Sequence, residues 1–396
     1  MIVRKTSAKN ENEALQIIKT TGCHKFAYKK LPKKMIENVI IVDDIDNRAV
    51  NILKQEALSC GTDAGVSEDI SRFKNGFSRV VLFGTTAQIE KLILKLQNQP
   101  FGLKELSAKL QELLKQEKVK TVFCGNKKIT TGKKALVMGI VNLSPDSFYG
   151  DGTKDEKALL SKALDMQEYG ADIIDVGAES SRPGSNPISE KEEIAGIKKF
   201  LQMLRKKTKL PISVDTYKPE VANVALNEGA DIINDIYALG YGRKMADIVS
   251  KNKAGIILMH MKGNPLTMQK NIKYDDVILE IFKFLSDRIE FALKNGIDKK
   301  SIMIDPGIGF GKTVENNLLI IKKLTEFTTL GMPLVVGLSN KSFLSKIIKV
   351  EEIKERFSAN IVANIASVAN GADIIRVHNV KEIVQSLKVF DAIRSV

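Results

Sequence analysis

The sequence of 396 residues contains no tryptophan and only three cysteines. Cys23, Cys60 and Cys124 have neither the spacing of a zinc site nor that of a disulfide framework, which fits a reducing compartment. The N-terminus lacks the apolar core of a signal peptide, and no apolar run approaches the roughly 18 residues of a membrane span. We therefore expect a soluble, cytoplasmic protein that has no membrane partner.

Compact runs of basic residues with interleaved aromatic side chains are also missing, although 61 Lys and Arg outnumber 47 Asp and Glu. The net charge of +14 is spread along the chain, which argues against nucleic acid as a partner. It suits either a lysine-rich surface or an anionic ligand. The apolar fraction of 43% is ordinary for a globular protein and provides for the core of one or two domains.

The first part of the chain is predicted to be a small α/β domain. Apolar runs at 39–42 and 80–83 indicate buried strands, and Thr86 is placed to cap the helix that follows the second run. Another helix is expected over about 102–116, and the charged stretch at its end marks a boundary. We therefore predict an N-terminal α/β domain of unknown role over 1–118 and a second domain over 119–396.

In the second domain, eight short runs rich in Ile and Val alternate with helical patterns. The runs do not alternate strictly between apolar and polar residues, as is typical of parallel strands buried on both faces. The pentapeptide Gly-Ala-Asp-Ile-Ile occurs at 170–174, 229–233 and 371–375, where its glycine can end a helix before the next strand. The strands are predicted at 136–142, 172–177, 211–215, 230–235, 254–260, 301–305, 333–338 and 372–378.

Eight successive βα units predict an α/β fold of the (β/α)8 TIM-barrel class, which typically takes ~250 residues. An open, doubly wound sheet is the alternative, but such sheets usually have fewer strands. A hairpin is expected at 121–130, turning at Gly125, and it would close the bottom of the barrel. Capping boxes, formed by Thr153 with Glu156 and by Ser189 with Glu192, are expected to open two of the helices.

Polar residues follow every predicted strand. In a TIM barrel the C-terminal ends of the strands form the mouth that carries the active site. Because each buried polar group costs ~1–3 kcal/mol unless it is paired, eight polar strand ends on one rim indicate a functional site. These residues are Asn142, Glu179 with Ser180, Ser181 and Arg182, Asp215, Asn234, His260, Asp305, Lys341, and Arg376 with His378.

One group of rim residues suits a flat heterocycle. Asp215 and Asp305 supply carboxylates and Asn234 supplies an amide. Together they match a ring that carries several N–H donors and an acceptor. This group therefore predicts a heterocycle-binding pocket.

The other rim residues suit an anion. Arg182, Lys341, Arg376 and His378 are basic, and arginine can bind a phosphate through two parallel hydrogen bonds. Asn142 supplies a neutral oxygen that could join phosphate oxygens and waters around Mg²⁺. This group therefore suits an anion such as phosphate.

The segment Asp-Pro-Gly-Ile-Gly-Phe-Gly-Lys-Thr at 305–313 is only superficially like a phosphate-binding P-loop. Gly307 is followed by three residues, rather than four, before Gly311, Lys312 and Thr313. We expect instead a tight glycine loop that holds Asp305, with the Phe310 side chain packed beneath it.

Several motifs in this order resemble those of the dihydropteroate synthase family over residues 121–396. The loops after the first two barrel strands are the most specific of them. Ser144 and Ser181 stand where the family usually has Thr, and Asn340 stands where it usually has Arg. The motifs are Asn-Leu-Ser-Pro-Asp-Ser-Phe at 142–148, Glu-Ser-Ser-Arg-Pro-Gly at 179–184, Ser-Val-Asp-Thr at 213–216, Asn-Asp at 234–235, Met-His-Met at 259–261, Asp-Pro-Gly-Ile-Gly-Phe-Gly-Lys at 305–312 and Arg-Val-His at 376–378.

The resemblance implies a transferase of folate biosynthesis that condenses 6-hydroxymethyl-7,8-dihydropterin diphosphate with 4-aminobenzoate, giving 7,8-dihydropteroate and pyrophosphate. It also implies Mg²⁺ as the metal, a homodimer formed through barrel helices, and inhibition by sulfonamides.

The resemblance further implies a role for each matching residue. Lys341, Arg376, His378 and Asp215 would be catalytic. The pterin would be held by Asp215, Asn234, Asp305 and Lys341, the diphosphate and its Mg²⁺ by Asn142, Arg376 and His378, and the aminobenzoate by Phe148, Ser181, Arg182, Pro183 and Ser342. Met259 would be a further substrate-binding residue.

Two other interpretations of the barrel stay open at this point. A pterin-binding methyltransferase that works with a folate and a cobalamin partner would share the two acids and the amide, but it would not need the basic residues for a diphosphate. A barrel that binds pterins without catalysis is the second alternative, and the complete set of polar rim residues argues against it.

Overall fold

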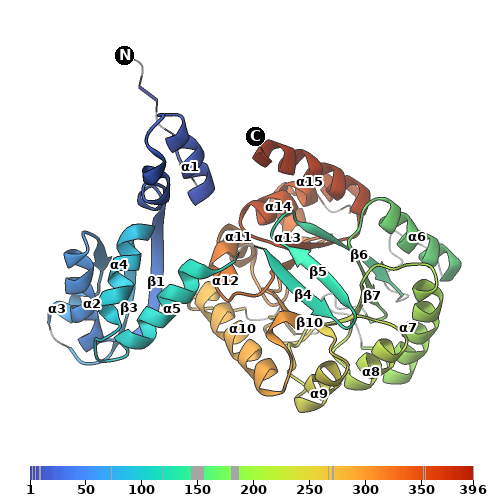
Figure 1. Ribbon diagram of the computed structural model, residues 1–396. Coiled ribbons are helices and arrows are strands. Elements are labelled where there is room, and N and C mark those ends of the chain that lie inside the picture. Colours follow the sequence, from blue (N-terminus) through green and yellow to red (C-terminus); the bar gives the residue numbers. More distant parts are fainter. Residues whose placement is uncertain are drawn as a thin grey trace. The chain divides into compact units, whose positions relative to one another are not determined.

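The computed structural model describes the chain except residues 2, 5, 9, 73, 118, 144–155, 180–186, 266, 270, 271, 351, 353 and 396. The chain divides into two compact units, Met1–Gln116 and Glu117–Val396 (Figure 1). Among the described residues, no helix is long and apolar enough to cross a membrane. Each unit has its own hydrophobic core and is described by itself.

The first unit is built on an antiparallel sheet of three described strands in the order β1-β3-β2. The two predicted apolar runs lie in β1 and β3. Thr85, rather than Thr86, is the N-cap of α4, because its hydroxyl accepts the Gln88 N–H. The elements are α1 (Glu11–Lys19), β1 (Glu37–Asp46), α2 (Asn47–Ser59), β2 (Asp63–Gly65), α3 (Glu68–Ser71), β3 (Phe77–Thr85), α4 (Thr86–Leu96) and α5 (Leu103–Lys115).

Strand β1 continues beyond the apolar run that predicts it. Its pairing with β3 shifts register between Val42 and Ile45, and Asp44 there has a φ of 53°. Such a bulge lets the strand run on through charged residues. On the face away from the core, Val39 is 73% exposed and lies opposite Phe83, which is 43% exposed. One face of this sheet is therefore packed and the other is apolar but open.

The second unit is a barrel. Eight of the described strands run parallel in the order β11-β10-β9-β8-β7-β6-β13-β12, and a bridge between Ile304 and Leu334 joins β11 to the start of β12 (Figure 1). The prediction of a (β/α)8 TIM barrel is confirmed. The strands are β6 (Leu136–Asn142), β7 (Ile173–Gly177), β8 (Ile212–Asp215), β9 (Ile232–Asp235), β10 (Gly255–Met259), β11 (Ile302–Asp305), β12 (Val335–Gly337) and β13 (Ile374–Val377).

The N-terminal end of the barrel is closed by a hairpin, as predicted. Strands β4 (Lys120–Cys124) and β5 (Lys127–Thr131) place Val122 and Ile129 in one apolar cluster with Met138 and other inward-facing strand residues. The hairpin is also bonded to the barrel, since Lys127 Nζ donates to the Asp231 carboxylate at 2.9 Å. Because this end is filled, a substrate has access only from the C-terminal end of the strands.

Helices surround the barrel and bury one face of each against the strands. The predicted capping box of Ser189 with Glu192 is present at the start of α7, whereas the one assigned to Thr153 lies outside the described residues. The helices are α6 (Glu156–Glu168), α7 (Glu190–Arg205), α8 (Pro219–Asn227), α9 (Arg243–Lys251), α10 (Val277–Lys294), α11 (Val314–Lys322), α12 (Leu324–Thr328), α13 (Ser342–Ile348), α14 (Phe357–Ala369) and α15 (Val380–Ser395).

Candidate functional site

The predicted rim residues lie at the C-terminal ends of neighbouring strands, except Ser180, Ser181 and Arg182, which are outside the described residues. In the strand register, Asp215 of β8 pairs with Asn234 of β9, and Met259 of β10 pairs with Asp305 of β11. On the other side, Arg376 of β13 pairs with Gly337 of β12. The two acids, the amide and the arginine therefore share one rim of the barrel, at the end opposite the closing hairpin.

Arg376 is the centre of a buried ion-pair network. Its Nε donates to Asp175 Oδ2 at 2.7 Å, and its NH2 group donates to Asp215 Oδ2 at 2.7 Å. Burial lowers the pKa of Arg376, but the Asp175 and Asp215 carboxylates outweigh this effect and raise it. In this structure the guanidinium charge is thus balanced by two protein carboxylates.

Asp175 is a site residue that the sequence reasoning missed. It lies in the middle of β7, where every residue is buried, and its own exposed fraction is 0%. A carboxylate in such a strand needs a cationic partner, because an isolated buried charge is very unfavourable. The single acid within the apolar run at 173–177 is therefore the signal that could have revealed it.

Burial shifts both acids of the heterocycle group toward neutrality. Desolvation raises the pKa of Asp215, although the Arg376 charge opposes the shift. Desolvation also raises the pKa of Asp305 to about 6, opposed by the Gly307 N–H and by the Lys341 charge. The Gly307 N–H donates to Asp305 Oδ1 at 2.7 Å and fixes the orientation of that carboxylate.

The substitution Asp305→Asn is expected to raise the melting temperature at pH 8 by ~3 °C or more, and by less at pH 5. The native pKa of about 6 lies above the ordinary pKa of an aspartate, 3.8, so the native state binds more protons and its stability falls as pH rises through this interval. Above pH 6 the native protein has lost all the stability that ionisation of Asp305 costs. Asn does not ionise, so the variant keeps this stability, and its amide oxygen still accepts the Gly307 N–H. Thermal unfolding of both proteins at the two pH values checks this, and equal shifts would contradict it.

Lys341 lies beside this carboxylate. Its Nζ is 3.8 Å from the centroid of the Phe310 ring, in a cation–π contact. The lysine can approach because Gly309 has no side chain, and a Cβ there would lie 2.9 Å from Lys341 Cδ. The neighbouring Ser342, which the resemblance assigns to the aminobenzoate pocket, is the first residue of α13 and is exposed.

His378 is held between three polar side chains. Its Nδ1 lies 2.9 Å from Ser339 Oγ, and its Nε2 lies 3.3 Å from Asn142 Nδ2. Both contacts are satisfied when Nδ1 carries the proton and donates to Ser339, because Asn142 then donates to Nε2. The Asn340 amide lies farther away, at 3.4 Å from Nδ1. Thus Asn142 uses its amide nitrogen on His378, and its oxygen is the atom with which it would bind a cation.

An apolar floor lies next to these polar groups. Ile236, Met259, Met268 and Phe310 are buried in one cluster, with Tyr237 among the partly buried residues packed against it. Met259 was predicted as a site residue, whereas Ile236 was not, because nothing in the sequence distinguishes it from a core isoleucine. A flat ring that hydrogen-bonds to acids at its edge would rest its face on such a floor.

Gly307→Ala is expected to disrupt the loop after β11. Gly307 has a φ of 66°, and an added Cβ would lie 1.8 Å from the His260 carbonyl oxygen. Because the clash forces the backbone next to Asp305 to move, we expect affinity for the pterin that the resemblance implies to fall ~10–100-fold. The matched control is Gly125→Ala, with a φ of 59° and no described atom within 4 Å of the new Cβ. Titrations of both variants with a pterin check this, and equal affinities would contradict it.

Glu179 belongs to a second network that the sequence reasoning did not anticipate. Lys218 Nζ donates to Glu179 Oε2 at 2.6 Å, to Glu193 Oε2 at 2.7 Å and to the Ile188 carbonyl at 2.8 Å. The Tyr217 hydroxyl donates to Glu179 Oε1 at 2.9 Å. Glu179 is therefore occupied by protein partners, and its role is to hold the ends of strands β7 and β8 together.

Four predicted residues of the aminobenzoate pocket, Phe148, Ser181, Arg182 and Pro183, lie outside the described residues. In the part of the chain that the structure describes, no group of three or more His, Cys, Asp or Glu side chains could hold a metal ion. A magnesium ion at this rim would therefore take the Asn142 oxygen together with oxygens of the substrate and water, as Mg²⁺ does in phosphate-binding sites.

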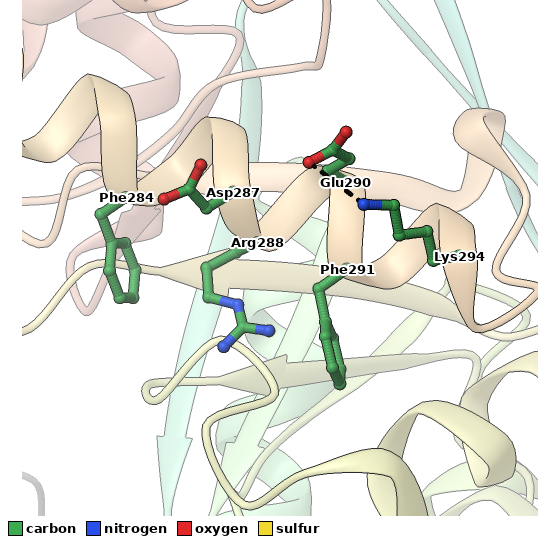
Figure 2. A pocket seen from close by; sticks show the side chains of 6 residues that line it. All are labelled: Phe284, Asp287, Arg288, Glu290, Phe291 and Lys294. Carbon is green, nitrogen blue, oxygen red and sulfur yellow. Dashed lines mark ion pairs between the residues drawn. The ribbon is translucent and has the colours of Figure 1, made fainter.

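A pocket of about 360 Å³ lies along α10 (Figure 2). Arg288 lies against the Phe291 ring there, 4.3 Å from its centroid. None of its lining residues comes from a strand end, so it is not the site described above. The lining residues are Phe284, Asp287, Arg288, Glu290, Phe291 and Lys294.

Comparisons with known proteins agree with this geometry. The family model described as pterin binding enzyme matches residues 138–378. The dihydropteroate synthase of Synechocystis sp. is 42% identical over 263 residues, which are 66% of this chain and 91% of that protein. The solved structure of Xanthomonas albilineans dihydropteroate synthase with 4-aminobenzoic acid is 36% identical, with a TM-score of 0.65, and the match covers 70% of this chain and 99% of that chain.

Another relative extends over the first unit as well. The bifunctional dihydropteroate synthase/dihydropteroate reductase of Helicobacter pylori is 33% identical over 397 residues, which are 99% of this chain and 99% of that protein. The first unit therefore has a counterpart in a relative that is named for two activities.

Proposed function

The chain belongs to the dihydropteroate synthase family of pterin-binding enzymes, and from this premise we propose that its barrel condenses 6-hydroxymethyl-7,8-dihydropterin diphosphate with 4-aminobenzoate. The observation that carries the proposal is the set of two acids and an amide, Asp215, Asn234 and Asp305, on one rim beside an apolar floor. The products are 7,8-dihydropteroate and pyrophosphate, as in folate biosynthesis.

The pterin binds with its edge toward the acids and its face on the floor. Carboxylates of Asp215 and Asp305 accept its N–H groups, and Asn234 can both donate and accept. Lys341 lies next to Asp305 and donates to an acceptor of the ring. The ionised acids are needed here, and the raised pKa of Asp305 means that pterin affinity weakens as pH falls through about 6.

The reaction is a displacement at the exocyclic methylene of the pterin. The bond from this carbon to the diphosphate oxygen breaks, and its electron pair leaves with pyrophosphate. The electron-rich ring spreads the positive charge, and the nearby Asp215 carboxylate stabilises it. The aniline nitrogen of 4-aminobenzoate then forms the new C–N bond and afterwards loses a proton. No strong general base is required.

The leaving diphosphate needs positive charge and hydrogen-bond donors at the rim. Lys341 supplies both, Arg376 adds its positive charge, and His378 contributes when its ring takes up a second proton at Nε2. Asn142 would hold a magnesium ion through its amide oxygen, and such an ion would neutralise negative charge on the diphosphate. Asn142 also keeps His378 in place through the contact between Nδ2 and Nε2, at 3.3 Å.

The aminobenzoate pocket is proposed from the family resemblance. Ser181, Arg182, Pro183, Phe148 and Ser342 would surround the ring and its carboxylate, and sulfonamides would compete for the same place. Asn340 cannot supply the positive charge of the usual Arg. Its amide instead lies 3.4 Å from His378 Nδ1, which supports a role beside the diphosphate.

We further propose a cytoplasmic homodimer in which barrel helices pack against each other. Val362 of α14 is 68% exposed, and Val389 and Ile393 of α15 are 63% and 68% exposed. Large apolar side chains grouped on neighbouring helices support an interface there. Light scattering of the purified chain tests this, and a mass of about 44 kDa would contradict it, since one chain has a mass of 43.8 kDa.

The test of the synthase function is an assay of the purified chain with pterin diphosphate, 4-aminobenzoate and Mg²⁺. Pyrophosphate and dihydropteroate should appear in equal amounts, and neither should form when aminobenzoate is left out. A methyltransferase or a barrel that only binds pterins would release no pyrophosphate, which would overturn the proposal.

A second candidate function is the reduction of dihydropteroate, which the full-length match to the bifunctional relative favours. The C=N bond of the dihydropterin ring would accept a hydride at carbon and a proton at nitrogen, with a reduced nicotinamide or flavin as the donor. The product of the barrel would then be the substrate of the second step. Oxidation of NADH or NADPH that depends on dihydropteroate, with and without added flavin, tests this. Its absence under all these conditions would contradict it.

A further inference from the structure

Lys312 follows the glycine loop between β11 and α11, and its side chain is buried, with an exposed fraction of only 3%. Its Nζ donates to the carbonyls of Gly307 at 2.8 Å and Phe310 at 2.9 Å, and to His260 Nδ1 at 3.0 Å. A longer contact of 3.3 Å reaches the His260 carbonyl. An ammonium group has three N–H donors and no acceptor, so the three shorter contacts match it fully.

The histidine in this cluster is suited to be the acceptor. Burial lowers the pKa of His260 to about 2, and the Lys312 charge adds to the shift, so the ring is neutral and Nδ1 has a lone pair. Burial also lowers the pKa of Lys312 well below its ordinary value, while the Asp305 charge and the three acceptors within 3.0 Å of Nζ favour the ammonium form. Lys341 and Lys262 are the other charges that act on Lys312, and both disfavour its ammonium form.

The loop that Lys312 holds carries three parts of the pterin site. The Gly307 N–H fixes Asp305 through the bond of 2.7 Å to Oδ1. Phe310 lies under the Lys341 ammonium, at 3.8 Å from the ring centroid. Phe310 is also part of the apolar floor. An acid, a cation and an aromatic face of the site therefore depend on the conformation of five residues, 307–311.

Other groups hold the outer side of this loop. The Gly309 N–H donates to Asn317 Oδ1 at 2.8 Å, and Gln269 Nε2 donates to the Gly309 carbonyl at 2.9 Å. The Tyr274 hydroxyl donates to the Gly311 carbonyl at 2.9 Å. Lys312 bonds to the inner carbonyls, so its loss leaves buried acceptors without a donor, and the loop is expected to rearrange.

We propose that Lys312 is a positioning residue of the condensation, which sets the glycine loop so that Asp305, Phe310 and Lys341 meet the pterin together. The proposal rests on the proposed function of the barrel. The three shorter contacts of Lys312 Nζ are all made to the loop carbonyls and to His260, so Lys312 acts through the loop. A lysine with a merely structural role would affect the melting temperature but not the kinetic constants.

The experiment compares Lys312→Met with a matched control, Lys127→Met, in the full-length chain. Lys127 is a partly buried lysine whose Nζ donates to Asp231 at 2.9 Å and to the Leu210 carbonyl at 2.7 Å, but it lies at the closed end of the barrel. Both variants should melt at lower temperature. Only Lys312→Met should raise the KM for pterin diphosphate, by ~10–100-fold, and lower kcat, because only there does the loop beside the substrate move.

Two milder variants keep the proposal testable if Lys312→Met does not fold. Lys312→Gln retains two N–H donors, and Tyr274→Phe removes a single hydroxyl from the outer side of the same loop. Each should raise the KM for pterin diphosphate, and the increase should be smaller than that caused by Lys312→Met. Kinetic constants equal to those of the wild type in the folded loop variants would overturn the proposal. An inactive wild-type chain would instead overturn the proposed function.

Discussion

Asp305→Ala and Lys341→Ala are each expected to lower turnover or pterin affinity by at least ~10²-fold, since removal of one stabilising donor in an active site typically costs ~10²–10³ in rate. Asp305 is buried at the rim with its carboxylate oriented by Gly307, and Lys341 lies beside it over Phe310. Asp305→Ala leaves the Lys341 ammonium without the neighbouring carboxylate, and Lys341→Ala leaves the Asp305 carboxylate without the neighbouring ammonium. Steady-state kinetics with varied pterin diphosphate, together with the pterin Kd, check the prediction.

The control for this pair is Asp373→Ala. Asp373 is likewise a carboxyl whose pKa burial raises, but it pairs with Lys120 at the closed end of the barrel. Its replacement should lower stability and leave the KM for pterin diphosphate unchanged. If Asp305→Ala and Lys341→Ala both kept near-normal kinetics, the assignment of the pterin pocket would be wrong.

Arg376→Met is expected to destabilise the barrel by ~3–5 kcal/mol, because it leaves a buried carboxylate without its counter-charge. Asp175 is fully buried, and its Oδ2 lies 2.6 Å from the Arg376 guanidinium. Urea unfolding of the variant and the wild type measures the difference. The loss should also remove activity, since Asp215 loses the same partner.

A double substitution separates these two effects. Arg376→Met combined with Asp175→Asn removes the charge at Asp175 but leaves Asp215 without Arg376, so it should recover part of the stability and little of the activity. A single Arg376→Met variant that is as stable as the wild type would contradict the role of the ion-pair network.

Much of the barrel was predictable because its signals are local. Short Ile- and Val-rich runs, helices that begin at capping residues such as Ser189, and glycines such as Gly170 at helix ends all repeat along the chain. Gly170 has a φ of 101°, which favours glycine at that position. In the first unit the extent of β1 was not predictable, because the bulge after Val42 depends on pairing with β3.

The site was predictable only where a polar residue ends a strand. Asp215, Asn234 and Asp305 follow that rule. Asp175 and Lys312 do not, because their importance depends on a partner far away in the sequence, Arg376 for one and His260 for the other. Ile236 could not be predicted, because in the sequence an apolar residue on the floor of a site looks the same as an apolar residue in the core.

The arrangement also shows what the site costs in stability. Burial raises the pKa of Asp215 and of Asp305, so the native state holds both carboxylates in an environment that disfavours their charge. Arg376, Lys341 and the Gly307 N–H offset part of that cost. A bound pterin, with N–H groups to donate, would offset more of it, so ligand binding should stabilise the barrel.

The most direct measurement is a crystal structure of the chain with a bound pterin. We expect the ring edge to contact Asp215, Asn234 and Asp305, and the ring face to lie against Ile236 and Met259. A pterin bound along α10, or in the first unit, with the rim acids left unengaged, would contradict it.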